Sequence, residues 1–172
     1  LTDFNFTEAM PTWSPDGKEI AFVTWNNSRE GHLYKTNVDG KGKPQRISKV
    51  PSVYSQPAWH SSNKIVVIKG SRQEYADAIG PTAFNTYDEI VWFDSKGGKE
   101  AQFIAKANGR TKPHFVLGEE RIYLHSWSKG LISIRWDGSD EKKHVEIEGI
   151  TTYGSSLYDE QNILSDKFQA VK

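Results

Sequence analysis

Residues 11–23 read PTWSPDGKEIAFV, which is a proline, an aromatic residue, a short polar turn and a run of apolar residues. The same order returns as PAWHSSNKIVVI at residues 57–68 and as PHFVLGEERIYL at residues 113–124. The repeated prolines stand at positions 11, 57 and 113, so the intervals between them are 46 and 56 residues. Self-similarity at such a spacing predicts a chain made of neighbouring repeats, with extra residues in the middle one.

Two further apolar runs follow each of these segments. They lie at residues 33–40, 89–98 and 131–138, and at residues 45–48, 101–104 and 144–147. Each repeat therefore supplies four short strands, and three Asp-Gly pairs suit the positive φ of tight hairpin turns. Helix is disfavoured, because Gly, Pro or polar clusters interrupt every stretch with helical spacing. We predict an all-β fold, a β-propeller fragment of about three four-stranded antiparallel blades with partial blades at both ends.

The repeat also sets the expected boundaries. Residues 1–10 would end a preceding blade, 11–50 would form one blade, 51–107 a blade with an inserted loop at 71–87, 108–149 a third blade, and 150–172 the start of the next. Propellers typically have 4–8 blades, so three blades would leave sheet faces open. We expect a fragment, or one side of an assembly, that packs against the remainder of its own propeller or forms a homo-oligomer.

Composition limits the function classes. The 172 residues are 36% hydrophobic and 12% aromatic, enough for a packed core. Lys+Arg and Asp+Glu are balanced at 22 each, so no single-sign field favours a nucleic-acid partner. The absence of cysteine excludes disulfides, thiolate zinc sites and a cysteine nucleophile. No apolar stretch approaches the roughly 20 residues of a membrane span, and the first residues lack a signal peptide's pattern, so an export signal was either removed or never present.

The segment WSPDGK at residues 13–18, followed by IAFV at 20–23, resembles the TolB-like, WD-repeat-like propeller repeat, and the resemblance covers all three units. Residues 57–59 with 65–71, residues 112–115 with 121–124, and residues 130–140 resemble the N-terminal propeller portion of secreted bacterial amidohydrolases. The second and third units depart from the motif, because residues 61–63 and 117–119 replace the Pro-Asp-Gly turn.

This resemblance implies a non-catalytic segment of a larger, periplasmic or secreted hydrolase. The propeller would serve domain packing, substrate gating or oligomer contacts beside a C-terminal catalytic domain, which would hold a zinc-like divalent metal. The segment itself would carry no catalytic residue, cofactor or metal, since its five histidines are isolated and the His-x-His pair of such enzymes does not occur. Two alternatives stay open: a periplasmic TolB-type interaction propeller, and the lid propeller of a prolyl-oligopeptidase-like or tricorn-like peptidase. A barrel with His-x-His, a Gly-x-Ser-x-Gly motif or an early stop beyond Lys172 would distinguish the three.

Large aromatic side chains recur at one point of each repeat, at Trp13, Trp59 and Phe115. We expect them to fill the space between blades rather than to form a stacking platform in a central channel. The same core role is expected of Trp92, Phe93 and Trp136. Three aspartates, Asp16, Asp39 and Asp137, are expected to form turns, because no loop gathers enough oxygen atoms for calcium.

Two groups of residues are candidates for contacts. His60 and His114 lie beside the first aromatic residue of a blade, where they either face the channel and a ligand or cap a turn. Residues 71–87 form the insertion, and they mix charge with aromatic side chains. This loop is either a hairpin tip without a function or a contact arm that reaches a partner or neighbouring domain. The arm's predicted contact residues are Arg72, Tyr75, Phe84 and Tyr87.

Overall fold

A computed structural model describes residues 6–26, 31–70 and 88–145. These residues form twelve strands and no helix, and so no helix long and apolar enough to cross a membrane lies among them. The strands are β1 (Thr7–Trp13), β2 (Glu19–Trp25), β3 (Leu33–Asn37), β4 (Gln45–Arg46), β5 (Val53–Trp59), β6 (Lys64–Gly70), β7 (Glu89–Asp94), β8 (Gln102–Lys106), β9 (Arg110–His114), β10 (Ile122–Ser126), β11 (Gly130–Ile134) and β12 (Lys142–Val145).

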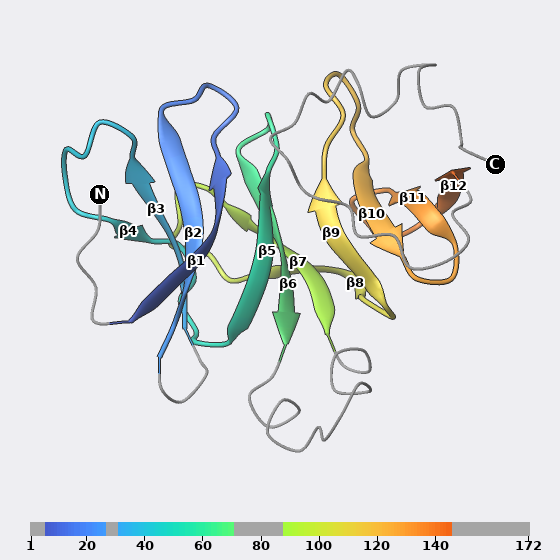
Figure 1. Ribbon diagram of the computed structural model, residues 1–172, viewed down its shortest axis with the longest axis horizontal. Helices are drawn as coiled ribbons and strands as arrows, with labels where there is room; N and C mark the ends of the chain where they lie inside the picture. The colour runs from blue at the N-terminus through green and yellow to red at the C-terminus, as the bar shows by residue number, and fades with distance from the viewer. Residues whose placement is uncertain (1–5, 27–30, 71–87, 146–172) are drawn as a thin grey trace.

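The strands make three four-stranded antiparallel sheets, each formed by four consecutive strands. We call them blade 1 (β1–β4), blade 2 (β5–β8) and blade 3 (β9–β12). The blades stand side by side in chain order (Figure 1), and β5 contacts both β1 and β9. The first strand of each blade is therefore its inner strand. This arrangement confirms the prediction of four strands per repeat.

Alternating side chains build two cores, one between each pair of blades. On β6, Ile65 and Val67 face blade 1, whereas Val66 and Ile68 face blade 3. This alternation follows from the strand period of two. The first core joins the blade 2 side chains to Ala21, Val23, Leu33 and Ile47 of blade 1. The second joins blade 2 to Phe115, Ile122, Leu124, Ile132 and Ile134 of blade 3.

The repeated aromatic residues do not all share one environment. Trp59 and Phe115 are 8% and 7% exposed, which confirms the core prediction for both, but Trp13 is 48% exposed. The core prediction is therefore wrong for Trp13. Trp59 packs toward blade 1 and Phe115 toward blade 2, so each lies on the face covered by the preceding blade. Among the described residues, no blade covers the corresponding face of blade 1.

Of the other aromatic residues predicted to lie in the core, one is fully buried and two are only partly buried. Phe93 is 2% exposed and lies in the first core, as expected. Trp92 and Trp136 are only partly buried against the second core. The ammonium group of Lys64 lies 4.9 Å from the ring centroid of Trp92 and 4.4 Å from that of Trp136. These two rings therefore hold a cation of blade 2 at the junction with blade 3.

The three turn aspartates act as predicted. Oδ1 of Asp16 accepts the backbone N–H of Lys18 at 3.1 Å, and Asp39 and Asp137 accept the N–H two residues later at 2.9 Å each. These hydrogen bonds stabilise the charged carboxylates, and together with the Ser14 and Ser139 hydroxyls they hold the pKa of Asp16 and Asp137 below the ordinary value. Among the described residues, no group of three or more acidic, histidine or cysteine side chains could hold a metal ion.

One predicted boundary needs correction. Blade 1 begins at Thr7 and not at residue 11, because Thr7, Glu8 and Ala9 still pair with β2. The repeated proline does not start the strand, because it lies within a β-bulge between Ala9 and Thr12. Residues 7–10 therefore belong to the first described blade.

Candidate binding surface on the inner strands

A β-bulge recurs in each of the three inner strands. The register shifts between Ala9 and Thr12 in β1, between Ser55 and Ala58 in β5, and between Thr111 and His114 in β9. The residues in the bulges are Met10, Gln56 and Lys112, each directly before the repeated proline and each with a φ of 52°. We call these three residues the bulge row.

The bulge row adopts a strained backbone. A positive φ at a residue other than glycine costs on the order of 1–3 kcal/mol and is concentrated at functional and ligand-holding positions. Contacts with the rest of the protein must stabilise this conformation at all three positions. Two hydrogen bonds within the row contribute: the N–H of Gln56 donates to Sδ of Met10 at 3.1 Å, and the N–H of Lys112 donates to Oε1 of Gln56 at 2.5 Å. The side chains of Met10 and Gln56 thus each satisfy the backbone N–H of the next bulge, and each ties two neighbouring inner strands together.

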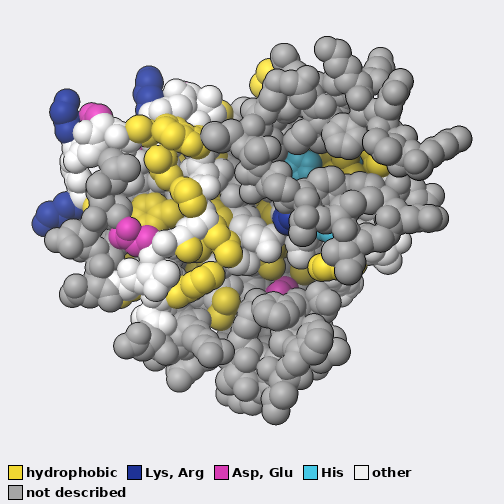
Figure 2. All heavy atoms as spheres, viewed as in Figure 1, with side chains coloured by type: hydrophobic (Ala, Val, Ile, Leu, Met, Phe, Trp, Pro, Cys, Tyr) yellow, Lys and Arg dark blue, Asp and Glu magenta, His cyan; other side chains and the backbone are white. Residues whose placement is uncertain are grey.

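The chemistry of this surface changes along the row. Hydrophobic side chains gather over β1 and β5 (Figure 2), and Met10 is 38% exposed. At blade 3 the row reaches a cationic region, since β9 contributes Arg110 and Lys112, while the neighbouring strand β10 contains His125. Neither of these two strands nor β5 contains a carboxylate. The inner surface therefore runs from apolar to positively charged.

His60 lies between blades 2 and 3. It is 3% exposed, and its ring centroid lies 4.7 Å from that of Phe115 and 5.3 Å from that of Trp136. Its Nδ1 accepts the N–H of Ser62 at 3.2 Å, so Nε2 carries the hydrogen and donates to the carbonyl of Glu119 at 3.3 Å. His60 caps its own turn and joins it to the loop before β10. The ring does not reach an open surface.

His114 lies on the face of blade 3 that is turned away from blade 2. It is partly buried, pairs in register with Tyr123, and donates from Nδ1 to the carbonyl of Lys112 at 2.9 Å. Burial lowers the pKa of the His114 imidazole, and it also lowers the pKa of His125 with help from the positive charge of Lys112. Both rings are therefore neutral at pH 7.

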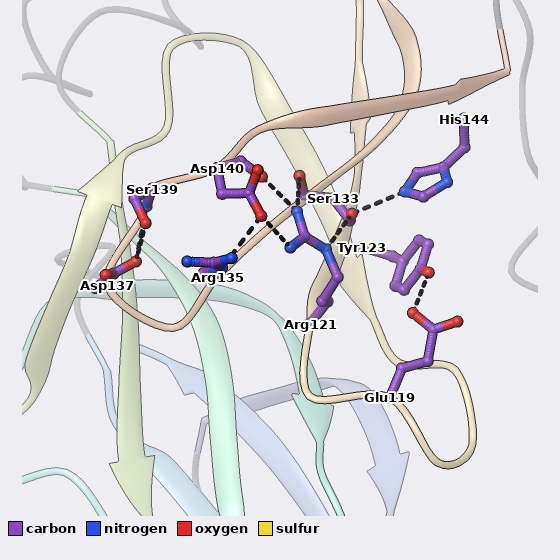
Figure 3. A network of polar contacts seen from close by, with 9 residues as sticks. All are labelled: Glu119, Arg121, Tyr123, Ser133, Arg135, Asp137, Ser139, Asp140 and His144. Atoms are coloured by element: carbon purple, nitrogen blue, oxygen red, sulfur yellow. Dashed lines mark hydrogen bonds and ion pairs between the residues drawn. The ribbon is translucent and has the colours of Figure 1, made fainter.

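A polar network fastens the outer strand of the same blade (Figure 3). Arg121 donates from Nε to Oγ of Ser133 at 2.8 Å and from Nη1 to Oδ2 of Asp140 at 2.9 Å. The Ser133 hydroxyl lies 2.7 Å from Nε2 of His144, on β12. Although a serine–histidine pair can form a nucleophile, Ser133 is fully buried and its hydroxyl cannot reach a substrate. The network is structural.

The remaining predicted site residues, Arg72, Tyr75, Phe84 and Tyr87, lie outside the described residues. The bulge row was missed by sequence reasoning. Its only signal was the recurrent proline, which restricts the residue before it but does not distinguish a bulge from an ordinary extended residue.

Comparison with known proteins identifies the architecture. The chain superimposes with a TM-score of 0.60 and 18% identity on a protein described as TolB from Agrobacterium tumefaciens, over 85% of this chain and 49% of that one. The fold is that of a TolB-like β-propeller. An oligogalacturonate lyase in complex with manganese gives a TM-score of 0.58 and 15% identity, over 80% of this chain and 40% of the lyase.

Sequence comparison adds a shorter match. The chain is 28% identical over 64 residues to an uncharacterised peptidase, YuxL, of Bacillus subtilis. The matched segment is 37% of this chain and 10% of that protein. No family model matches the chain. The chain thus spans less than half the length of these structural relatives, and its matched segment is a tenth of the peptidase.

Proposed function

We propose that these blades are a non-catalytic segment of a larger propeller, which packs against and gates the catalytic domain of a hydrolase. The observation that carries the proposal is the exposed side chain of Trp13 on the open face of blade 1. Trp13 pairs with Ile20 just as Trp59 pairs with Ile65, so both tryptophans occupy the same position of the repeat. Trp59 is buried by blade 1, and a further blade at the same place would bury Trp13.

The free energy favours such a contact. Burial of a large apolar side chain contributes roughly 1.5–3 kcal/mol, and Trp13 is 48% exposed on this face. Residues on the opposite face of blade 1 already belong to the core with blade 2. The sheet is therefore built to be covered on both sides, as propeller blades are.

Fluorescence quenching tests this packing in the full-length gene product. The emission of Trp13 is obtained by subtracting the spectrum of the Trp13→Phe variant from that of the wild type, and the emission of Trp59 is obtained in the same way from Trp59→Phe. We expect acrylamide to quench the Trp13 emission as weakly as it quenches the Trp59 emission. Trp127, which is 61% exposed, is the matched accessible control. A Trp13 emission quenched as strongly as that of Trp127 would show that nothing covers blade 1.

The parent hydrolase we propose is a metal-dependent amidohydrolase, periplasmic or secreted, because residues 57–59, 65–71, 112–115, 121–124 and 130–140 resemble the propeller portion of such enzymes. Its divalent, zinc-like metal would be bound by the catalytic domain. We expect the full-length protein to hydrolyse amide model substrates, to lose activity with a chelator, and to keep it in His60→Ala and His114→Ala. Chelator-insensitive hydrolysis by the 172-residue segment alone would contradict this division of labour.

A peptidase is the second candidate, and the match to YuxL over 64 residues favours it. In that case the blades would form a lid that admits substrates by size. A serine-directed reagent, rather than a chelator, would then abolish the activity of the full-length protein. Inhibition by the chelator would therefore indicate the amidohydrolase, and inhibition by the serine-directed reagent would indicate the peptidase.

The insertion at 71–87 is proposed as the contact arm toward the catalytic domain, through Arg72, Tyr75, Phe84 and Tyr87. Arg and Tyr are favoured at the centres of protein interfaces. Replacing both Arg72 and Tyr75 with alanine should weaken assembly of the full-length protein, as measured by limited proteolysis between domains. A pair of exposed lysines outside the loop, Lys18 and Lys41, provides the control double substitution. Unchanged proteolysis would exclude the arm.

A further inference from the structure

Strand β12 is held to blade 3 with little help from apolar burial. All four of its residues are exposed, and its pairing with β11 is interrupted by a register shift between Leu131 and Ile132. The outer strand of blade 2 differs, because Ile104 of β8 is 3% exposed and Lys106 pairs with Glu89 at 2.9 Å. The outer strands β4 and β8 each lead to the inner strand of the next blade, so β12 holds the position from which the chain continues to the next unit.

The Ser133 hydroxyl joins β12 to the body of blade 3 (Figure 3). Its Oγ accepts the Nε–H of Arg121 at 2.8 Å and lies 2.7 Å from Nε2 of His144. Ser133 is fully buried, so water offers its hydroxyl hydrogen no other acceptor. Because the Arg121 guanidinium can only donate, that hydrogen goes to Nε2 of His144. The imidazole in this arrangement is the neutral tautomer with its own hydrogen on Nδ1.

Protonation of His144 is incompatible with this arrangement. An imidazolium donates from both ring nitrogens and accepts at neither. The Ser133 oxygen would then face two cationic donors, Arg121 and His144, and its own hydrogen would lose its acceptor in a fully buried place. A buried polar group without a partner and two like charges at one oxygen atom both destabilise the contact.

The charged groups around His144 give an imidazolium no ion pair that would compensate. The titratable or charged side chains that face the ring are Glu119, Arg121, Tyr123 and Lys142. Strand β11 contributes none. Within residues 6–26, 31–70 and 88–145, no carboxylate forms an ion pair with His144, and Glu119 binds the Tyr123 hydroxyl instead. Partial loss of solvation is the largest cause of the lowered pKa of His144; Glu119 opposes it, whereas Arg121 and Lys142 add to it.

We infer that His144, Ser133 and Arg121 form a latch on β12 that opens when the imidazole is protonated. At pH 7 the neutral ring accepts the Ser133 hydroxyl and holds the strand on β11. As the pH falls below the ordinary imidazole value of 6.5, the imidazolium gives up this bond, and β12 detaches more often from the edge of blade 3. Acidification thus loosens the connection between blade 3 and the next unit. The latch does not depend on which hydrolase the parent is, so its test is separate from the tests of the proposed function.

Hydrogen exchange of the full-length protein at pH 7.5 and pH 5.5 tests the latch, with rates converted to protection factors so that the intrinsic effect of pH is removed. We expect protection of the Lys142–Val145 amides to fall about fivefold or more, relative to that of β10, in the wild type. His144→Gln keeps an acceptor for the Ser133 hydroxyl but does not titrate, so β12 should stay protected at both pH values. His32→Asn is the matched control, because His32 also bonds a serine, Ser48 at 3.0 Å, but lies in blade 1. In this variant β12 should respond to pH as in the wild type.

The imidazole itself gives a second readout that does not depend on the folding of any variant. NMR of the ring nitrogens of His144 in the wild type should show the hydrogen on Nδ1 at pH 7.5 and a titration midpoint below 6.5. The midpoint should rise in Ser133→Ala, which lacks the bond that favours the neutral ring. A hydrogen on Nε2 at pH 7.5, level protection of β12 between the two pH values, or an equal fall in the wild type and His144→Gln would overturn the latch.

Discussion

Gly138 is a single residue on which the junction of two blades depends. It has a φ of +79°, and a Cβ atom there would lie 2.4 Å from the backbone oxygen of Ile104 in blade 2. We expect Gly138→Ala to destabilise the protein by about 1–3 kcal/mol beyond the cost of its backbone conformation, because the clash is with backbone and cannot relax by rotation. Urea denaturation measures the difference.

Gly17 is the matched control, since it has a φ of +69° in the equivalent Asp-Gly turn but nothing within 4 Å of a Cβ atom. Gly17→Ala should cost only the conformational term, about 1–2 kcal/mol. Equal losses in both variants would mean that the approach of the blade 3 turn to β8 is not tight in solution.

The roles of residues could be predicted from the sequence where the residue type itself favours the conformation that the position requires. Asp-Gly pairs predicted turns correctly because both residues favour the required geometry. The burial of Trp59 was predictable from its type, but the exposure of Trp13 was not, because burial depends on the neighbouring blade and the motif is identical. The bulge row was not predictable, because Met, Gln and Lys have no common preference for positive φ and only the sheet imposes it.

The outer strand β12 is an element held by a few polar contacts. All four of its residues are exposed, so apolar burial contributes little, and the Ser133 hydroxyl links Arg121 of the loop before β10 to His144 of β12. Ser133→Ala removes the partner of both groups and should cost about 1–3 kcal/mol. Hydrogen exchange of the Lys142–Val145 amides should accelerate more than exchange in β10.

Ser139→Ala serves as the comparison for this element. Ser139 bonds only to Asp137 in an exposed turn, and its loss should change stability by no more than about 0.5 kcal/mol. If Ser133→Ala left β12 exchange unchanged, the backbone pairing with β11 alone would hold the strand.

At the scale of the whole molecule, histidine burial makes stability depend on pH. Burial lowers the pKa of His32 in blade 1 and of His114 and His125 in blade 3 below the ordinary value of 6.5. The unfolded chain therefore binds more protons than the folded one as the pH falls through 6.5, so the stability present above that value is lost on acidification. Carboxylates with lowered pKa, such as Glu89 and Asp94, stay charged through this range.

We expect the free energy of unfolding, measured by urea denaturation, to fall between pH 7.5 and pH 5.5. The loss should be smaller in His114→Asn, whose amide can still donate to the Lys112 carbonyl but does not titrate. Protection factors from hydrogen exchange, which correct for the slower intrinsic exchange at lower pH, should fall in blades 1 and 3, because the histidines with a lowered pKa lie there. A stability that is level or rises toward pH 5.5 would mean that the imidazoles are as well solvated in the folded protein as in the unfolded chain.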